Sequence, residues 1–276
     1  ILIENIHNVV DMTEEEMNSW AAEAKFLKAY YHFLLFTYYG PIPIVDENLP
    51  ISASDNEVRV KRSTVDQSVD YIVQTIDDAI VDLPVRELSS NDLGRIDQVI
   101  AKSIKSRVLL YAASPLFNGN SEMYSGFINE DGEHYFNQTY DQTKWDLAKD
   151  ASLDAINAAL ENGVGLYEFS STPPNYEDEY EESEFLRTLY DLKYTIVDKW
   201  NSELIWGNSN PVRDKDWWQM QAACMMKNPS ASSVEAAWQW IAPTLRIAEL
   251  FYTENGLPID QDLTYDFQNR FNTATV

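Results

Sequence analysis

One stretch of the chain limits the possible folds more than any other: a long apolar and aromatic run that stops at a glycine followed by two prolines. Within residues 24–39 the basic side chains are Lys25, Lys28 and His32, which recur at i, i+3 and i+7 and therefore share one narrow stripe of a helix. A helix that is apolar around the rest of its circumference has to be covered by neighbouring elements on most sides. We therefore predict a chain that is built around a deeply buried helix.

The same helix has clear signals at both ends and is rich in aromatic rings. Thr13 and Glu16 have the spacing of a capping box, which predicts the start of the helix. Gly40 ends it, and Pro41 and Pro43 impose an extended exit. We predict that its seven rings belong to the hydrophobic core: Phe26, Tyr30, Tyr31, Phe33, Phe36, Tyr38 and Tyr39.

Three more helical segments follow, within residues 63–84, 97–115 and 143–163, at a spacing of roughly 35–45 residues. In the first of them, one face collects the apolar residues Val65, Val69, Ile72, Ile76, Ala79 and Leu83. The buried stripe of the next is expected to be Ala101, Ile104, Val108 and Tyr111. The last should bury Trp145, Ala148, Ala155, Ile156, Ala159 and Leu160.

These patterns predict a mainly α fold with tetratricopeptide-like helix pairs that form a short solenoid scaffold, although no tetratricopeptide consensus fits without gaps. The polar and aromatic residues 118–142 are expected to form a surface loop. We expect residues 1–276 to be a single unit that is incomplete at both ends. Within it, the helical scaffold would occupy residues 1–165, and a loop-rich region with minor β-strands would occupy residues 166–276.

The loop-rich region begins with two prolines and an acidic tract, residues 175–185, that shows no helical stripe. A mixed segment follows, and the sequence LIWG at residues 204–207 is predicted to be a short strand. The sequence PTLRIAELFY, residues 243–252, is predicted to be a final helix, closed by Asn255-Gly256. Rings in such loops indicate function more strongly than rings in helices.

The charge of the chain limits its possible partners, and its cysteine content limits its possible disulfides. The 276 residues carry a formal net charge of -25, from 45 acidic and 20 basic residues, which disfavours nucleic acid and anionic membrane surfaces as partners. Cys224 is the single cysteine, so no disulfide can form within the chain. No apolar run in the sequence is long enough to span a bilayer.

The sequence lacks the motifs of the common catalytic and phosphate-binding sites. It contains no G-x-S-x-G, Walker, G-x-G-x-x-G or H-E-x-x-H sequence, and its three histidines are scattered. We therefore expect no enzyme activity and no cofactor. Two alternatives stay open: a helical glycosidase that uses two of the many carboxylates, and a calcium ion held by the acidic residues 178–184.

Two adjacent tryptophans are the best candidates for ligand contact. Trp217 and Trp218 lie in a predicted loop beside Arg213 and Gln219. A flat aromatic face stacks on the C–H face of a sugar ring, while polar neighbours bind its hydroxyl groups. We therefore predict a carbohydrate-binding platform at these four residues, with burial of one or both indoles in the core as the alternative.

Four stretches, in this order along the chain, resemble the SusD/RagB family of surface glycan-binding lipoproteins from Bacteroidetes. They are AKFLKAYYHFLLFTYYGPIPIV (24–45), AKSIKSRVLLYAASPLFNG (101–119), NSELIW (201–206) and PTLRIAELFYTENGLPID (243–260). Lys25 stands where the family often has arginine. The second stretch is the most specific, and together the four reach from near the beginning of the sequence to near its end.

The resemblance implies a non-catalytic protein on the outer membrane at the cell surface. Such a protein captures oligo- or polysaccharide and delivers it to a SusC-like TonB-dependent transporter. It implies a lipid anchor upstream of Ile1, so that Cys224 is not the anchoring cysteine and membrane contact occurs only through that anchor. Family members are much longer, so part of the usual domain is expected to be missing. The family shares no ligand-contact motif, and two alternatives remain: a peptide-binding lid of the same fold and a helical scaffold for other proteins.

Overall fold

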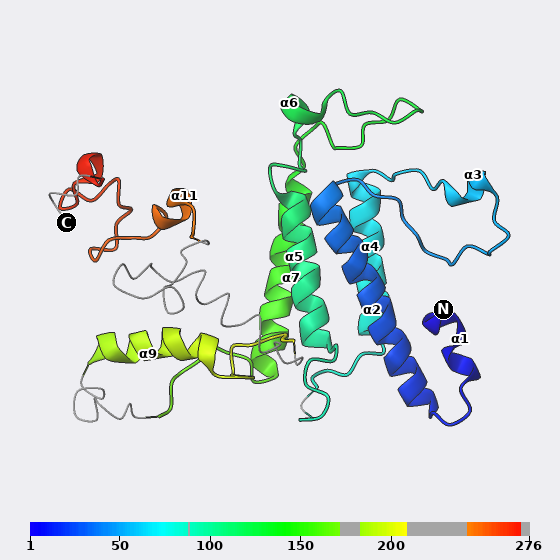
Figure 1. Cartoon of the computed structure of the whole chain (residues 1–276), viewed down its shortest axis with the longest axis horizontal. Coiled ribbons are helices and arrows are strands. Elements are labelled where there is room, and N and C mark those ends of the chain that lie inside the picture. Colours follow the sequence, from blue (N-terminus) through cyan, green and yellow to red (C-terminus); the bar gives the residue numbers. More distant parts are fainter. Residues whose placement is uncertain (88, 172–182, 209–241, 272–276) are drawn as a thin grey trace, which may run out of the picture. The chain divides into compact units, whose positions relative to one another are not determined.

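The structure, a computed structural model, describes residues 1–87, 89–171, 183–208 and 242–271. Throughout these ranges the regular elements are helices, and strand-like pairing is limited to isolated β-bridges. Figure 1 shows the helices labelled along the chain. The predicted mainly α fold class is therefore confirmed.

The backbone contacts divide the chain into two compact units, Ile1–Ser209 and Asn210–Val276. The first unit holds the long helices, and the described part of the second holds only short ones. The compositional boundary at residues 165/166, between a scaffold and a ligand-facing region, stays a prediction.

The long helix predicted at the start of the chain is α2, Glu14–Tyr39. Its capping box is present as predicted: the Thr13 hydroxyl accepts from the backbone N–H of Glu16, and the Glu16 carboxylate accepts from the N–H of Thr13 at 2.8 Å. These bonds hold the pKa of Glu16 below its usual value. Gly40 ends the helix with φ +69°, a left-handed conformation that glycine adopts without strain.

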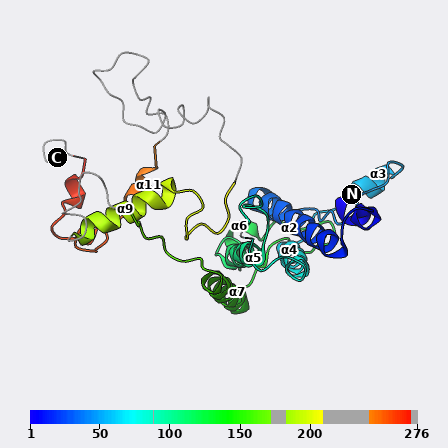
Figure 2. The ribbon, with the colours of Figure 1, turned by 90° about the horizontal axis from the view of Figure 1, so that it is seen from below.

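Three further long helices complete the scaffold: α4, Val65–Ile80; α5, Gln98–Ala113; and α7, Gln142–Glu161. Helix α2 packs on α4, α4 on α5, and α5 on α7. Successive members of this series run in opposite directions (Figure 1), and the four form one group in the end view of Figure 2. Two antiparallel helix pairs, α2/α4 and α5/α7, are therefore present as predicted.

The helix starts follow side-chain capping, with small differences from the predicted boundaries. Thr64, one residue after the predicted Ser63, caps α4 together with Gln67. Asp97 caps α5 by accepting from the N–H of Ile100 at 2.9 Å. The cap of α7 is Asp141, two residues before the predicted start.

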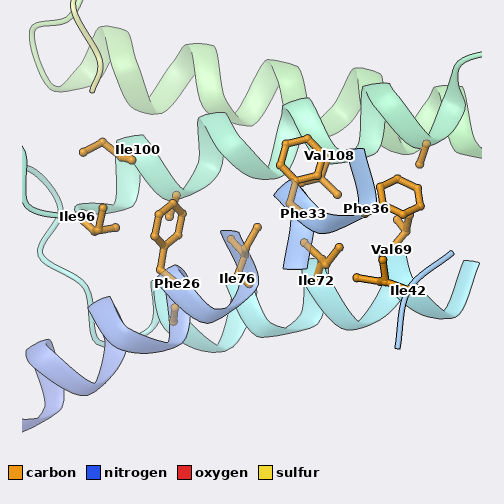
Figure 3. Packing of buried hydrophobic residues seen from close by; sticks show 14 of the residues in the cluster. Phe26, Phe33, Phe36, Ile42, Val69, Ile72, Ile76, Ile96, Ile100 and Val108 are labelled. Atoms are coloured by element: carbon orange, nitrogen blue, oxygen red, sulfur yellow. The ribbon is translucent and has the colours of Figure 1, made fainter. Parts of the chain in front are cut away.

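The core lies where α2, α4 and α5 meet, and the predicted stripe of α4 is buried completely. Figure 3 shows Val69, Ile72 and Ile76 pointing toward the aromatic rings of α2. Burial of each such side chain contributes about 1.5–3 kcal/mol relative to exposure. The core residues drawn in Figure 3 also include Phe26, Phe33, Phe36, Ile42, Ile96, Ile100 and Val108.

The prediction that all seven rings of α2 are core is wrong for three of them. Phe26, Phe33 and Phe36 are buried, whereas Tyr31, Tyr38 and Tyr39 are 60%, 80% and 66% exposed. The reason is that, within the described part of the chain, α2 packs mainly on α4, with smaller contacts to α1, η1 and α5. An apolar pattern around a helix shows that burial is compatible with the sequence, but the number of neighbours decides how much surface is covered.

The predicted stripe of α7 is also only partly buried. Ala148, Ala155 and Ala159 are buried against α5, whereas Ile156 and Leu160 are 54% and 62% exposed. Among the described helices α7 packs only on α5, so its narrow line of alanines makes that contact and the larger residues lie beside it.

The loop expected over residues 118–142 is mostly exposed, but it is anchored in the core. It contains the one-turn helix α6, Ser121–Tyr124. Phe136 is buried, stacks on Tyr124 at 3.8 Å between ring centroids, and stacks on Phe117 at 5.7 Å. The remaining short elements described in the first unit are α1 (Leu2–Asn5), η1 (Ile6–Asn8) and α3 (Asp55–Val58).

Residues 204–207 do not form the predicted strand. Ile205 and Trp206 are adjacent, yet both pack against the core cluster, which a strand would prevent because successive side chains alternate between its two faces. Arg86 donates to the carbonyl of Ile205 at 3.2 Å, and the Trp206 indole donates to the carbonyl of Gly94 at 3.1 Å. These contacts attach the segment to the scaffold.

Two other helices differ from the sequence predictions. Helix α9, Glu184–Val197, follows the acidic tract and was not predicted; Ser183 caps it by accepting from the N–H of Leu186. In the second unit the predicted helix over residues 243–252 is the single turn α11, Leu245–Ala248. The chain then turns back to form a bridge between Tyr252 and Pro258, and η2, Phe267–Asn269, follows.

Candidate functional site

The four ligand-binding residues predicted from the sequence, Arg213, Trp217, Trp218 and Gln219, lie outside the described residues. The proposed calcium tract lies almost entirely outside them as well. Across the described part of the chain, no three or more His, Cys, Asp or Glu side chains are grouped so that they could hold a metal ion. Of the helices in the same part, none has the length and apolar character needed to cross a membrane.

A different candidate site lies in the second unit, on the turn that follows α11. It is a hollow of about 440 Å³. Its walls combine two tyrosine rings, two carboxylates, two hydroxyl groups and two apolar side chains. The lining residues are Ala248, Tyr252, Thr253, Glu254, Ile259, Asp262, Thr264 and Tyr265.

The backbone of this turn explains how the two tyrosines come together. The N–H of Thr253 donates to the carbonyl of Leu257 at 2.8 Å, and Gly256 has φ +69° in the turn between them. The N–H of Asp262 donates to the carbonyl of Pro258 at 3.1 Å, and the N–H of Tyr265 donates to the carbonyl of Asp262 at 3.1 Å. The chain thus reverses its direction twice. As a result Tyr252 and Tyr265, which are thirteen residues apart in sequence, line the same hollow.

A single carboxylate, that of Asp262, holds the turn in this shape. One of its oxygens accepts from the hydroxyl of Thr253 and from the amide of Asn255 at 3.0 Å. The other accepts from the backbone N–H and the hydroxyl of Thr264, at 2.9 and 2.6 Å. Asn255 also donates to the Thr264 hydroxyl at 3.1 Å. Both ends of the turn are therefore tied to one side chain.

These donors stabilise the ionised form of Asp262. The hydrogen bonds from Thr253, Thr264 and Asn255 hold the pKa of Asp262 far below its usual value. A carboxyl group of this kind is a poor proton donor near neutral pH, and its lone pairs are already engaged. Its role is to position the turn, and it does not supply the acid of a glycosidase pair.

The remaining groups of the hollow are suited to bind a polyhydroxylated ligand. Tyr252 is 68% exposed and Tyr265 is 42% exposed, so both rings offer an apolar face together with a hydroxyl group. Glu254 and the two threonines add further hydrogen-bonding groups. Flat apolar faces with polar groups at the rim are the chemical requirements of a sugar site.

Sequence reasoning missed these residues although their surroundings were noticed. The sequence LPIDQD, residues 257–262, is predicted to be a turn, but Tyr252 is assigned to the helix that Asn255-Gly256 closes, and Tyr265 is given no role. The available signal was the density of Asp, Asn and Thr around the glycine, because these residues bond to nearby backbone groups and fix turns.

Comparison with known proteins gives matches to one family model and to solved structures. Residues 1–110 match the model of the SusD-like_3 family, described as "Starch-binding associating with outer membrane". The solved structure of BT4246 is similar over 95% of this chain, with 30% sequence identity and a TM-score of 0.78. These matches support the SusD/RagB family.

Another solved structure supports the SusD-like fold. A SusD-like protein (BF3747) from Bacteroides fragilis NCTC 9343 matches 93% of the chain at 16% identity, with a TM-score of 0.61. The chain spans 46% of BT4246 and 40% of BF3747, so it covers less than half the length of either protein. A comparison with curated proteins gives no match.

Proposed function

We propose that the protein captures a glycan and holds it without cleaving it. The observation that carries this proposal is the hollow in which Tyr252 and Tyr265 share their exposed rings with polar neighbours on a turn fixed by Asp262. The match of residues 1–110 to a family model described as starch-binding supports the same chemistry. In this proposal the tyrosine rings stack on the sugar, and Glu254 and the threonine hydroxyls bind its hydroxyl groups.

A binding role accounts for the carboxylates of the hollow better than hydrolysis does. Glycoside hydrolysis requires one carboxyl group that can donate a proton and a second that acts as base or nucleophile. Asp262 is held ionised by its hydrogen bonds, which leaves Glu254 as the other carboxylate of the hollow. The hollow therefore supports non-covalent capture.

The wider context of the proposal comes from the family. The match to a family associated with the outer membrane supports a cell-surface location, reached through a lipid anchor. We further propose that the protein delivers its glycan to a SusC-like TonB-dependent transporter. Co-purification of such a transporter from outer membranes in mild detergent would support this partner, and quantitative recovery of the protein alone would count against it.

The predicted platform of Trp217, Trp218, Arg213 and Gln219 remains part of the proposal as a second glycan contact. Alanine at either tryptophan should weaken binding at least tenfold while the thermal midpoint hardly changes. If both variants unfold at a much lower temperature, these rings belong to the core and the platform is refuted.

The proposal is tested by retardation of the full-length protein in native gels that contain soluble starch, dextran, galactomannan or xylan. We expect at least one neutral polysaccharide to slow migration, and no reducing ends to be released on prolonged incubation. Failure to bind any polysaccharide would contradict glycan capture. Release of sugar that is lost on replacing one carboxylate would favour the glycosidase instead.

A further inference from the structure

An exposed tryptophan on the scaffold, Trp20, has no role in the proposed function. Trp20 lies on α2, on the side opposite Ala22 and Phe26, which are buried in the core. Its side chain is 46% exposed. Its helical register therefore keeps the indole out of the core, and another feature has to hold it in place.

That feature is Arg95, from the loop that precedes α5. Its guanidinium carbon lies 5.3 Å from the centroid of the Trp20 ring, in the range of a cation–π contact. The guanidinium also donates to the carboxylate of Glu23, at 2.6 and 3.0 Å, and to that of Asp92 at 3.3 Å. The Glu23 bonds contribute most to raising the pKa of Arg95. The indole therefore meets a fixed cation and is held in one orientation before any ligand arrives.

Trp20 contributes to the lining of two hollows. One, of about 340 Å³, has mainly apolar walls made with Leu2, Ala24 and Leu27. The other, of about 330 Å³, is polar and includes Glu15, Ser19 and Glu87. Trp20, Glu23 and Arg95 line both hollows, so an extended ligand crossing the indole would meet apolar groups on one side and hydrogen-bonding groups on the other.

The charge of the polar hollow selects among possible ligands. Its lining holds the four carboxylates of Glu15, Glu16, Glu23 and Glu87 against the one guanidinium of Arg95. Glu16 stays ionised because its capping bonds lower its pKa, and Glu23 is paired with Arg95. An excess of fixed negative charge repels a uronate or sulfate group, whereas uncharged hydroxyl groups can donate to carboxylates.

We propose that Trp20, oriented by Arg95 and Glu23, is an additional contact for an uncharged glycan, and that the surrounding carboxylates exclude acidic glycans. This inference rests on the proposed function. It adds a class of ligand, neutral polysaccharide, and a binding position on the helical scaffold in a different unit from the Tyr252–Tyr265 hollow.

The test measures binding of the full chain to starch, dextran, galactomannan, xylan and polygalacturonate. Trp20→Ala should weaken binding of the preferred neutral polysaccharide at least fivefold, and Trp20→Phe should restore it to within about twofold. The matched control is Tyr31→Ala: Tyr31 is 60% exposed on the same side of α2 but lines neither hollow, and its loss should leave binding unchanged. Thermal midpoints should agree among these variants.

A double variant tests whether the carboxylates of the polar hollow exclude acidic glycans. Wild type should not bind polygalacturonate, and Glu15→Gln combined with Glu87→Gln should bring polygalacturonate binding closer to that of the neutral polymer. A fluorescence change on adding the neutral polymer should shrink in Trp20→Phe, because the Trp20 indole then no longer reports the bound sugar.

Three outcomes would overturn the inference, and they separate it from the proposed function. If Trp20→Ala binds as wild type does while Tyr252→Ala binds weakly, glycan capture stands and the Trp20 contact does not exist. If wild type prefers polygalacturonate, the charge selection is wrong. If no polysaccharide binds, both proposals fail; Trp20-dependent binding of a lysine-rich peptide would then assign the acidic hollow to a basic peptide.

Discussion

The four-helix scaffold and the turn around Asp262 are held together by different physical means. In the scaffold, rows of apolar residues such as Val65, Val69, Ile72 and Ile76 are buried between helices, and many contacts share the stabilisation. In the turn, one carboxylate collects four donors and fixes the backbone, while large apolar residues such as Leu263 stay exposed.

These two means of stabilisation leave different parts of each region free to bind a ligand. A scaffold that depends on its inner rows tolerates change on its outer face, so exposed rings such as Trp20 are free to contact ligands. A turn that depends on one side chain exposes nearly all its other groups, but it loses its shape if that side chain is lost. Substitutions can therefore be chosen that affect the scaffold and spare the turn, or the reverse.

The largest effect is expected in the scaffold core. Phe26 is fully buried and packs edge-to-face with Trp206 at 5.9 Å between ring centroids. Phe26→Ala should lower the free energy of unfolding by about 3–5 kcal/mol because it removes buried area and leaves a cavity. Denaturant unfolding measures this. The control is Tyr38→Ala on the same helix, where the ring is 80% exposed and the change should stay within about 0.5 kcal/mol. Equal effects at the two positions would contradict the burial described for α2.

The next largest effect is expected on glycan binding, when the turn around Asp262 is disrupted. Asp262→Ala leaves the Thr253, Asn255 and Thr264 donors without their acceptor, so the two tyrosines should no longer be held together. Binding of a neutral polysaccharide should fall about tenfold, the typical loss at a binding hot spot, while the unfolding midpoint of the scaffold stays where it is in wild type. A variant that binds normally would show that the hydrogen bonds of Asp262 do not organise the site.

The ionisation of the same residue predicts how the turn responds to acid. Because the folded-state pKa of Asp262 is lowered, its contribution is fully present above the unfolded-state value, about 4, and is lost progressively as the pH falls toward the folded-state pKa. The near-ultraviolet dichroism of the tyrosines should therefore be constant from pH 8 to pH 5 and change below about pH 4. Asp262→Asn should lack this component, and an identical acid response in that variant would refute the assignment.

A smaller effect is expected at a helix start. Thr64 accepts the N–H of Gln67 at 3.2 Å and opens α4. Thr64→Ala should cost about 1 kcal/mol of stability, and Thr64→Ser should cost less because serine keeps the accepting oxygen. Thermal unfolding of the two variants measures the difference. Equal destabilisation by alanine and serine would argue that the methyl group matters and the cap does not.

Burial in the scaffold could be predicted from the sequence where a helix has a single apolar face that packs on its neighbours. The five stripe residues within α4 are buried, as is Leu83 beyond its end, and α5 starts next to Asp97, where a helix start is predicted. The prediction failed where the number of neighbours decides burial, as for Tyr38 and Ile156, because periodicity describes a helix and not its surroundings. Helix α9 was missed although Phe185, Leu189, Leu192 and Ile196 have helical spacing, because an acidic tract runs directly into them.

The candidate site was harder to predict for a physical reason. Tyr252 and Tyr265 come together only because two chain reversals fix their relation, and those reversals depend on hydrogen bonds of one aspartate. Residue patterns report periodic burial, but an irregular turn leaves no period in the sequence. The Trp206 contact with Gly94, more than a hundred residues earlier, is another pairing of this kind.

Glycan binding by the two tyrosines is tested most directly by calorimetric titration of Tyr252→Ala and Tyr265→Ala with the neutral polysaccharide that wild type prefers. Each substitution should weaken binding at least tenfold, with an unfolding midpoint equal to that of wild type. Tyr38→Ala, which removes an even more exposed ring from the scaffold, should bind as wild type does. If both tyrosine variants retain wild-type affinity, the hollow on the Asp262 turn is not the glycan site.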